Sequence, residues 1–336
     1  MKGMGQMAFC NDARSGALVV AALALSNPVT AACAVAGCLA STLTARAVVP
    51  ADDACLGMGL YGFNGALVGA AATVLLPFPP AAGTLLGLTA AGASLTTLLA
   101  VPLQKRLGSI PFLSIPFNAV IISLLASVKQ LPPSAAEFLS SSSPSSPSSP
   151  SSPGATLSSI SAHFAPVFQR ADELAAQVMA SDLLAGCAGM AFAARPVTGV
   201  LMLAAIAVSY GPLSRPIPAA TAALYAAAGA ALGAGLMRGL QLAPDAMVAL
   251  GLHGFNPALT MLALYTFLAP AKGGHSSPAL FAYASLAATV ATALNAALGH
   301  ALDASFGLPA CAVPFCISAC TFIALAKHVP ALKSRF

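Results

Sequence analysis

The sequence predicts an all-α, polytopic membrane protein with about ten transmembrane helices in two inverted five-span repeats. Two observations carry this prediction. Hydrophobic residues make up 58% of the 336-residue chain and charged residues only 7%, with a mean hydropathy of +0.87, whereas an ordinary soluble domain has about 25% charged residues. One phrase also occurs twice inside long apolar runs, as LYGFNGAL at 60–67 and as LHGFNPAL at 252–259.

Other matched pairs follow in the same order, which indicates an internal duplication. GMGQMAF at 3–9 matches GCAGMAF at 186–192, and PFLSIPF at 111–117 matches PACAVPF at 309–315. The offset between the copies grows slightly along the chain, as a few loop insertions would produce. A repeat of this kind determines the architecture of the whole chain.

Apolar runs of about 20 residues, the length that crosses the hydrocarbon core, fall five to each half. They lie at 5–24, 27–45, 56–76, 81–102 and 110–128, and again at 184–209, 216–236, 246–269, 278–299 and 307–326. Because five is odd, the second copy must enter the membrane from the opposite side, so the repeats are predicted to be inverted. Inverted repeats place a solute site near the midplane, at broken helices where the copies meet.

The two repeats are predicted to span 1–130 and 166–336, joined by a linker at 131–165. The linker is rich in Ser and Pro, including repeated Ser-Ser-Pro triplets. Such a composition cannot bury enough apolar surface to fold, so we expect a disordered tether.

The basic residues of the connecting segments predict the orientation. The side that holds both termini carries most of them: Lys2, Arg46, Lys105, Arg106, Arg215, Lys272, Lys327, Lys333 and Arg335. Lys and Arg concentrate on the cytoplasmic side, which predicts cytoplasmic termini and an extracellular linker, with the plasma membrane as the default location. The net charge of +5 is then a topology signal, and no basic-aromatic patch suggests a nucleic-acid partner.

Proline pairs mark predicted breaks in two pore-lining helices. Pro111 and Pro116 bracket Ser114, and at the same spacing Pro309 and Pro314 bracket Ala312. Proline removes a backbone donor, and at membrane depth irregular backbone is tolerated only against protein or a water-filled cavity.

The two Gly-Phe-Asn phrases combine a flexible point, an aromatic wall and an amide. We expect the amides of Asn64 and Asn256 to satisfy backbone groups that such breaks set free.

The distribution of charge predicts passive transport rather than a coupled carrier or an enzyme. The acidic residues fall at span ends or in loops, whereas coupled carriers usually hold ionisable groups at depth. A pore for a small neutral solute needs only hydrogen-bond acceptors and an apolar constriction. The histidines are dispersed, and the cysteines lack the close paired spacing of zinc or redox sites. Both observations indicate no metal site and no cofactor.

Four of these motifs together resemble the urea transporters of bacteria and animals. They are GLYGFNGALVG at 59–69, SIPFN at 114–118, GLHGFNPAL at 251–259 and LPACAVPFC at 308–316. The resemblance covers nearly the whole chain outside the linker. It implies a passive channel for urea in the lipid bilayer, with a pore in each protomer and assembly as a homotrimer.

The resemblance also implies roles for single residues. Aromatic and leucine side chains would form a flat slot for planar urea: Phe9, Phe63, Phe255, Leu67 and Leu259, together with Phe192 as the repeat mate of Phe9. Gln6 and Ser114 would accept the amide hydrogens of urea, although the family usually has Thr at the position of Ser114.

The chain departs from the family pattern in its second half. Gly189 replaces a Gln or Glu, Ala312 replaces a pore Thr, and His253 replaces a usual Trp. These losses leave open two alternatives: a channel for another small neutral solute, such as another amide, ammonia or water, and a non-conducting membrane homologue.

Overall fold

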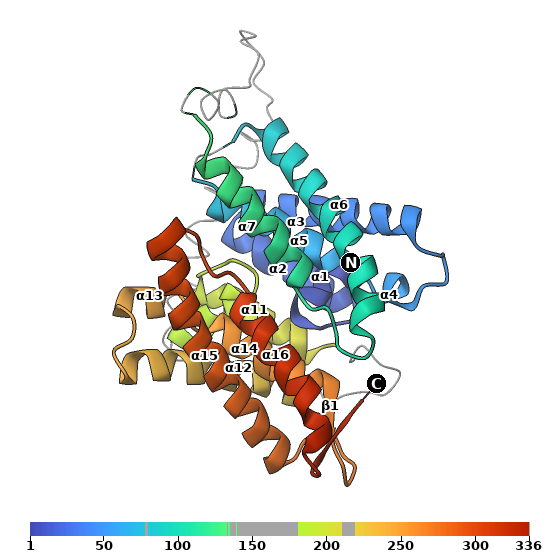
Figure 1. Ribbon diagram of the computed structural model, residues 1–336, viewed down its shortest axis with the longest axis vertical. Helices are drawn as coiled ribbons and strands as arrows, with labels where there is room; N and C mark the ends of the chain where they lie inside the picture. The colour runs from blue at the N-terminus through green and yellow to red at the C-terminus, as the bar shows by residue number, and fades with distance from the viewer. Residues whose placement is uncertain (78–79, 133, 135–138, 140–180, 210–218, 336) are drawn as a thin grey trace.

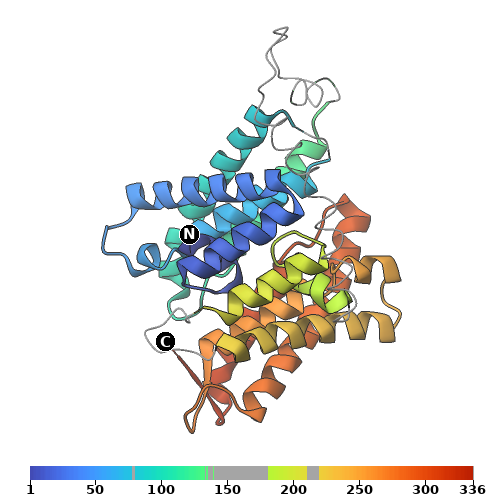
Figure 2. The same ribbon diagram turned by 180° about the vertical axis from the view of Figure 1, so that it is seen from behind.

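The computed structural model describes residues 1–77, 80–132, 134, 139, 181–209 and 219–335 (Figure 1). The first half of the chain occupies one end of the molecule and the second half the other, as Figures 1 and 2 both show. Most of the predicted linker at 131–165 lies outside the described residues, as does the beginning of the predicted span 216–236.

Apart from the short 3₁₀ helices η1 and η2, the two halves contain the same order of helices, which supports the predicted duplication. The first half contains α1 (Lys2–Gly5), η1 (Gln6–Ala8), α2 (Ala13–Ser26), α3 (Pro28–Val48), α4 (Ala54–Gly57), α5 (Gly62–Leu75), α6 (Ala82–Leu107) and α7 (Ile115–Lys129). The second half contains α10 (Ser181–Gly189), α11 (Pro196–Ala207), α12 (Ala219–Gly239), α13 (Asp245–Ala249), α14 (Phe255–Phe267), α15 (Pro278–Phe306), α16 (Val313–Leu325) and η2 (Ala326–His328).

By length and composition, four described helices can cross a membrane: α3, α6, α15 and residues Ala220–Gly239 of α12. A fifth crossing is possible if residues 2–8 and 13–26, which meet at 74°, form one bent span. Other predicted spans are divided. The run 56–76 is broken between α4 and α5, and 246–269 between α13 and α14, because Gly59 and Gly251 both take φ +76° in the break, a conformation that glycine alone adopts freely.

A short β-pair departs from the all-α prediction. β1 (Leu268–Pro270) pairs antiparallel with β2 (Leu332–Ser334), with Leu268 opposite Ser334. Strands of three residues are too short to produce a period-two hydrophobic pattern, so they could not be predicted from the sequence. The pair fastens the C-terminal segment to the end of α14.

Close helix packing at small residues holds each half together. A Cβ placed on Gly37 of α3 would lie 2.1 Å from the carbonyl oxygen of Gly65 in α5. A Cβ on Gly69 would lie 2.1 Å from the carbonyl oxygen of Cys33. Membrane helices approach this closely where small residues face each other.

Helices that are repeat partners meet where the two halves join. Thr198 at the start of α11 donates from Oγ1 to the carbonyl of Ala22 near the end of α2, at 3.4 Å. The thiol of Cys10, just before α2, lies 3.8 Å from the carbonyl oxygen of Ala205 near the end of α11. The beginning of each helix therefore contacts the end of its partner, so α2 and α11 run antiparallel.

Candidate functional site

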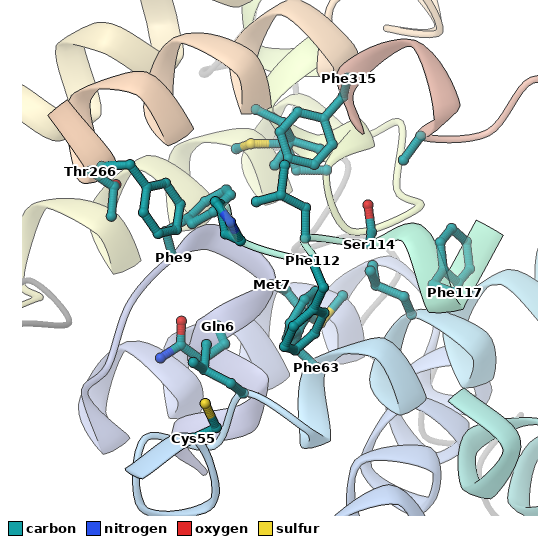
Figure 3. A pocket seen from close by; sticks show the side chains of 18 of the residues that line it. Gln6, Met7, Phe9, Cys55, Phe63, Phe112, Ser114, Phe117, Thr266 and Phe315 are labelled. Atoms are coloured by element: carbon teal, nitrogen blue, oxygen red, sulfur yellow. The ribbon is translucent and has the colours of Figure 1, made fainter. Parts of the chain in front are cut away.

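A cavity of about 220 Å³ is lined by residues from both halves (Figure 3). The structure brings together at this cavity every residue that the sequence placed in a solute path: Gln6, Phe9, Phe63, Leu67, Ser114, Phe192, Phe255 and Leu259. Of the residues expected to shape the pore, Pro111 also lines it. The others, Asn64, Pro116, Asn256, Pro309 and Pro314, stand outside the lining.

Irregular backbone forms much of the cavity wall. Phe9 and its repeat mate Phe192 have φ of 60° and 58°, and Leu113 and its mate Cys311 have φ of 46° and 47°. The left-handed region is unfavourable for bulky L-residues and stores about 1–3 kcal/mol of strain at each position. Strain at matched positions in two repeats, beside one cavity, is typical of a functional site.

Two buried asparagines hold this backbone in place. Asn64 donates from Nδ2 to the carbonyl of Leu113 (3.2 Å) and accepts at Oδ1 from the amide of Phe117 (3.1 Å). The hydrocarbon interior offers no water to backbone groups, so an irregular segment must find its partners within the protein. One side chain thus satisfies both the strained carbonyl and the first turn of α7.

The second repeat contains the same arrangement. Asn256 donates from Nδ2 to the carbonyl of Cys311 (3.1 Å) and accepts at Oδ1 from the amide of Phe315 in the first turn of α16 (3.2 Å). We call Asn64 and Asn256, with these bonds, the asparagine bridges. They supply the backbone partners that the sequence led us to expect of these amides.

The four prolines of the predicted breaks lie before or at the beginning of helices rather than within them. Pro116 and Pro314 occupy the first turns of α7 and α16, where the missing N–H has no intrahelical partner to lose. The predicted spans 110–128 and 307–326 therefore begin as irregular segments, and helix starts only at Ile115 and at Val313.

Aromatic rings surround the cavity. Phe63 stacks on Phe112 with ring centroids 6.2 Å apart and an interplanar angle of 14°. Phe9 meets the ring of Phe315 edge-on at 6.2 Å, and Phe192 meets Phe117 at 5.8 Å. These last two contacts are equivalent under the repeat, and each joins one half to the other.

The polar groups of the cavity lie mainly in the first half. Gln6, only 5% exposed, donates from Nε2 to the carbonyl of Met58 at 3.0 Å, which leaves its Oε1 as an acceptor (Figure 3). Ser114, 3% exposed, lies with its Oγ 3.2 Å from the Sγ of Cys316. The described lining residues include no Asp, Glu, Lys, Arg or His.

Sequence reasoning missed several lining residues. The aromatic ones are Phe112, Phe117, Phe267 and Phe315, and the polar ones are Gln104, Ser109 and Thr266. The duplicated phrase PFLSIPF could have indicated Phe117 and Phe315, which are repeat mates beside the predicted break. The others have no repeat signal.

His253 does not line the cavity. Its Nδ1 lies 3.1 Å from the Nδ2 of Asn295, whose Oδ1 in turn accepts from Asn256 at 3.1 Å. The residue that replaces the usual Trp therefore belongs to the support of the second asparagine bridge.

Comparison with known proteins decides the family. The urea transporter family model matches the chain twice, over residues 1–182 and 180–335. The chain belongs to the urea transporter family. Urea transporters carry a solute across a membrane and are not enzymes.

Mammalian urea transporters are similar to the chain along nearly its whole length. Urea transporter 1 of Rattus norvegicus is 29% identical over 98% of this chain and 77% of that protein. Urea transporter 1 of Mus musculus is 29% identical and that of Ovis aries 28% identical, with the same coverage.

Replacing either bridging asparagine with alanine should destabilise the protein. Asn64→Ala or Asn256→Ala would leave a buried carbonyl and a buried N–H without partners, at about 1–3 kcal/mol for each group. The midpoint of thermal unfolding in detergent, followed with a dye that reacts with exposed thiols, should fall clearly in both variants. Gln130→Ala, at an exposed end of α7, is the control, and equal midpoints in all three variants would contradict the assigned role.

Proposed function

We propose that this member of the urea transporter family is a passive channel that conducts urea through the cavity between its two repeats. The observation that carries the proposal is the character of that cavity: an apolar space walled by aromatic rings, with buried amide and hydroxyl oxygens and no Asp, Glu, Lys, Arg or His among its described lining residues. A neutral, planar solute rich in N–H donors fits such a space better than an ion does.

The geometry supports a simple mechanism. Urea that leaves water must replace the hydrogen bonds of its N–H groups, and Oε1 of Gln6 and Oγ of Ser114 can accept them. The rings of Phe63 and Phe255 and the side chains of Leu67 and Leu259 restrict the shape of what passes. Because the described lining contains no Asp, Glu, Lys, Arg or His that could couple transport to protons or cations, we expect flux to follow the urea gradient alone.

We further propose ten membrane crossings in two inverted repeats, with both termini cytoplasmic. The antiparallel contact of the repeat partners α2 and α11 supports inversion. Two hydrogen bonds of basic residues support the proposed assignment of segments to the same side of the membrane. Lys2 donates to the carbonyl of Gly57, and Lys129 donates to that of Phe306. Each pair joins segments that the proposed topology puts on one side. Family resemblance supports a homotrimer, which the mass of the purified protein in detergent would test.

A second candidate keeps the channel and changes the solute. Gly189 and Ala312 occupy the positions in the second repeat that Gln6 and Ser114 occupy in the first, and neither has a polar side chain. Another small amide, ammonia or water could therefore pass more readily than urea. Liposome fluxes of urea, acetamide, ammonia and water, compared with those of protein-free liposomes, separate these solutes.

An epitope inserted in the linker at 131–165 should be labelled by antibody on intact cells, because the proposed orientation places it outside the plasma membrane. A C-terminal epitope should be labelled only after permeabilisation. The reverse pattern would overturn the orientation without affecting the proposed solute.

Removing the Ser114 hydroxyl should slow urea flux. The Ser114→Ala protein in liposomes, followed by stopped-flow light scattering, should conduct urea about three- to tenfold more slowly than the unmodified protein, the equivalent of one hydrogen bond. Ser318→Ala is a matched control, because Ser318 is also buried but bonds to the carbonyl of Ala287. Unmodified protein that adds nothing to the urea permeability of empty liposomes would refute the proposed function.

A further inference from the structure

The second half of the cavity carries one feature without a counterpart in the first half. Residues at the end of α14, Thr266 and Phe267, line the cavity, whereas the repeat-equivalent residues at the end of α5, Val74 and Leu75, do not. The cavity therefore extends toward α14 in a way that the duplication does not explain.

Thr266 stands out chemically at this place. The described lining residues from the second half are otherwise glycine, alanine, methionine, leucine and phenylalanine, and Thr266 alone among them has a polar side chain. It is only 4% exposed. Its neighbour Phe267 meets the ring of Phe9, one of the residues in the proposed urea path, edge-on with ring centroids 6.0 Å apart, and Figure 3 labels Thr266 and Phe9 among the side chains that line the cavity.

The hydrogen bond of Thr266 determines what its hydroxyl can do. Its Oγ1 donates to the carbonyl of Leu262 at 2.8 Å, one turn earlier in α14. With its hydrogen used in this way, the oxygen can only accept further hydrogen bonds. It is thus suited to a solute that presents N–H groups.

The C-terminal segment fixes the position of Thr266. The amide of Arg335 donates to the carbonyl of Phe267 at 2.9 Å, and its Nε donates to that of Leu268 at 2.7 Å. Its guanidinium carbon lies 5.8 Å from the centre of the Tyr265 ring. The residues on both sides of Thr266 are therefore contacted by Arg335, Phe267 through its backbone amide and Tyr265 through its guanidinium.

We propose that Thr266 is a solute-contacting residue that accepts an amide N–H, and that it provides in the second half the polar contact that Gly189 and Ala312 lack. This inference rests on the proposed function, since it assigns a further contact in the same urea path. The Thr266 contact adds a third acceptor for amide hydrogens to a cavity in which only Gln6 and Ser114 occupy the expected positions.

The test replaces the hydroxyl without changing the size of the side chain. Thr266→Val should lower urea flux in liposomes by about three- to tenfold, the effect of one lost hydrogen bond, whereas Thr266→Ser should keep most of it. Thr260→Val is the matched control: Thr260 is also buried in α14 and bonds one turn back, to the carbonyl of Asn256, but it does not line the cavity.

The ratio of urea to acetamide flux separates a solute contact from a packing defect. Urea has two NH₂ groups and acetamide has one, so loss of an acceptor should slow urea more than acetamide and lower the ratio in Thr266→Val alone. A packing defect would slow both solutes together and leave the ratio unchanged.

The inference would be overturned if Thr266→Val conducted urea as fast as Thr260→Val, or if both solutes slowed equally. Neither result would affect the proposed function, provided that the unmodified protein conducts urea. Failure of the unmodified protein itself would instead contradict the proposed function.

Discussion

Every irregular stretch of backbone at membrane depth needs hydrogen-bond partners from the protein itself, and the architecture of this chain depends on how that need is met. The asparagine bridges meet it twice. Asn64 and Asn256 each join a strained carbonyl to the first turn of the helix that follows, and both are buried. With these bonds, α7 and α16 can begin in the interior of the molecule, and the residues before them can form the cavity wall.

The two repeats share this scaffold but differ in their chemistry. The strained positions, the bridges and the ring contacts between halves occur in matched pairs. Polar groups do not: Gln6 and Ser114 face the cavity from the first half, while their mates are Gly189 and Ala312. The duplication thus preserves the residues that satisfy the backbone and the aromatic and leucine side chains of the cavity, whereas the polar lining groups have diverged.

The sequence predicted the apolar repeats and eight residues that line the cavity, but it did not predict where the helices begin and end. The resemblance of the motifs to the urea transporters named the residues expected in the solute path, and all of them line the cavity. Helix ends were predicted poorly. Apolar composition does not reveal that Gly59 and Gly251 take positive φ, nor that helix begins only after Ser114 and Ala312.

The contact of the C-terminal segment with the end of α14 could not be predicted from the sequence either. β2 and Arg335 reach α14 through backbone carbonyls, which leave no trace in side-chain patterning. Thr266 could not be recognised for the same reason, since its place in the lining depends on how far the cavity extends along α14. Contacts of this kind follow from tertiary structure alone.

The central claim is that urea crosses the membrane through the cavity between the repeats, and blocking that cavity tests it most directly. Leu67 lines the cavity and is 8% exposed, whereas Leu86 on α6 is 48% exposed and lies outside the lining. Urea flux in liposomes should fall to the protein-free rate for Leu67→Trp and stay at the unmodified rate for Leu86→Trp. Equal flux through both variants, with both proteins folded, would mean that urea takes another path.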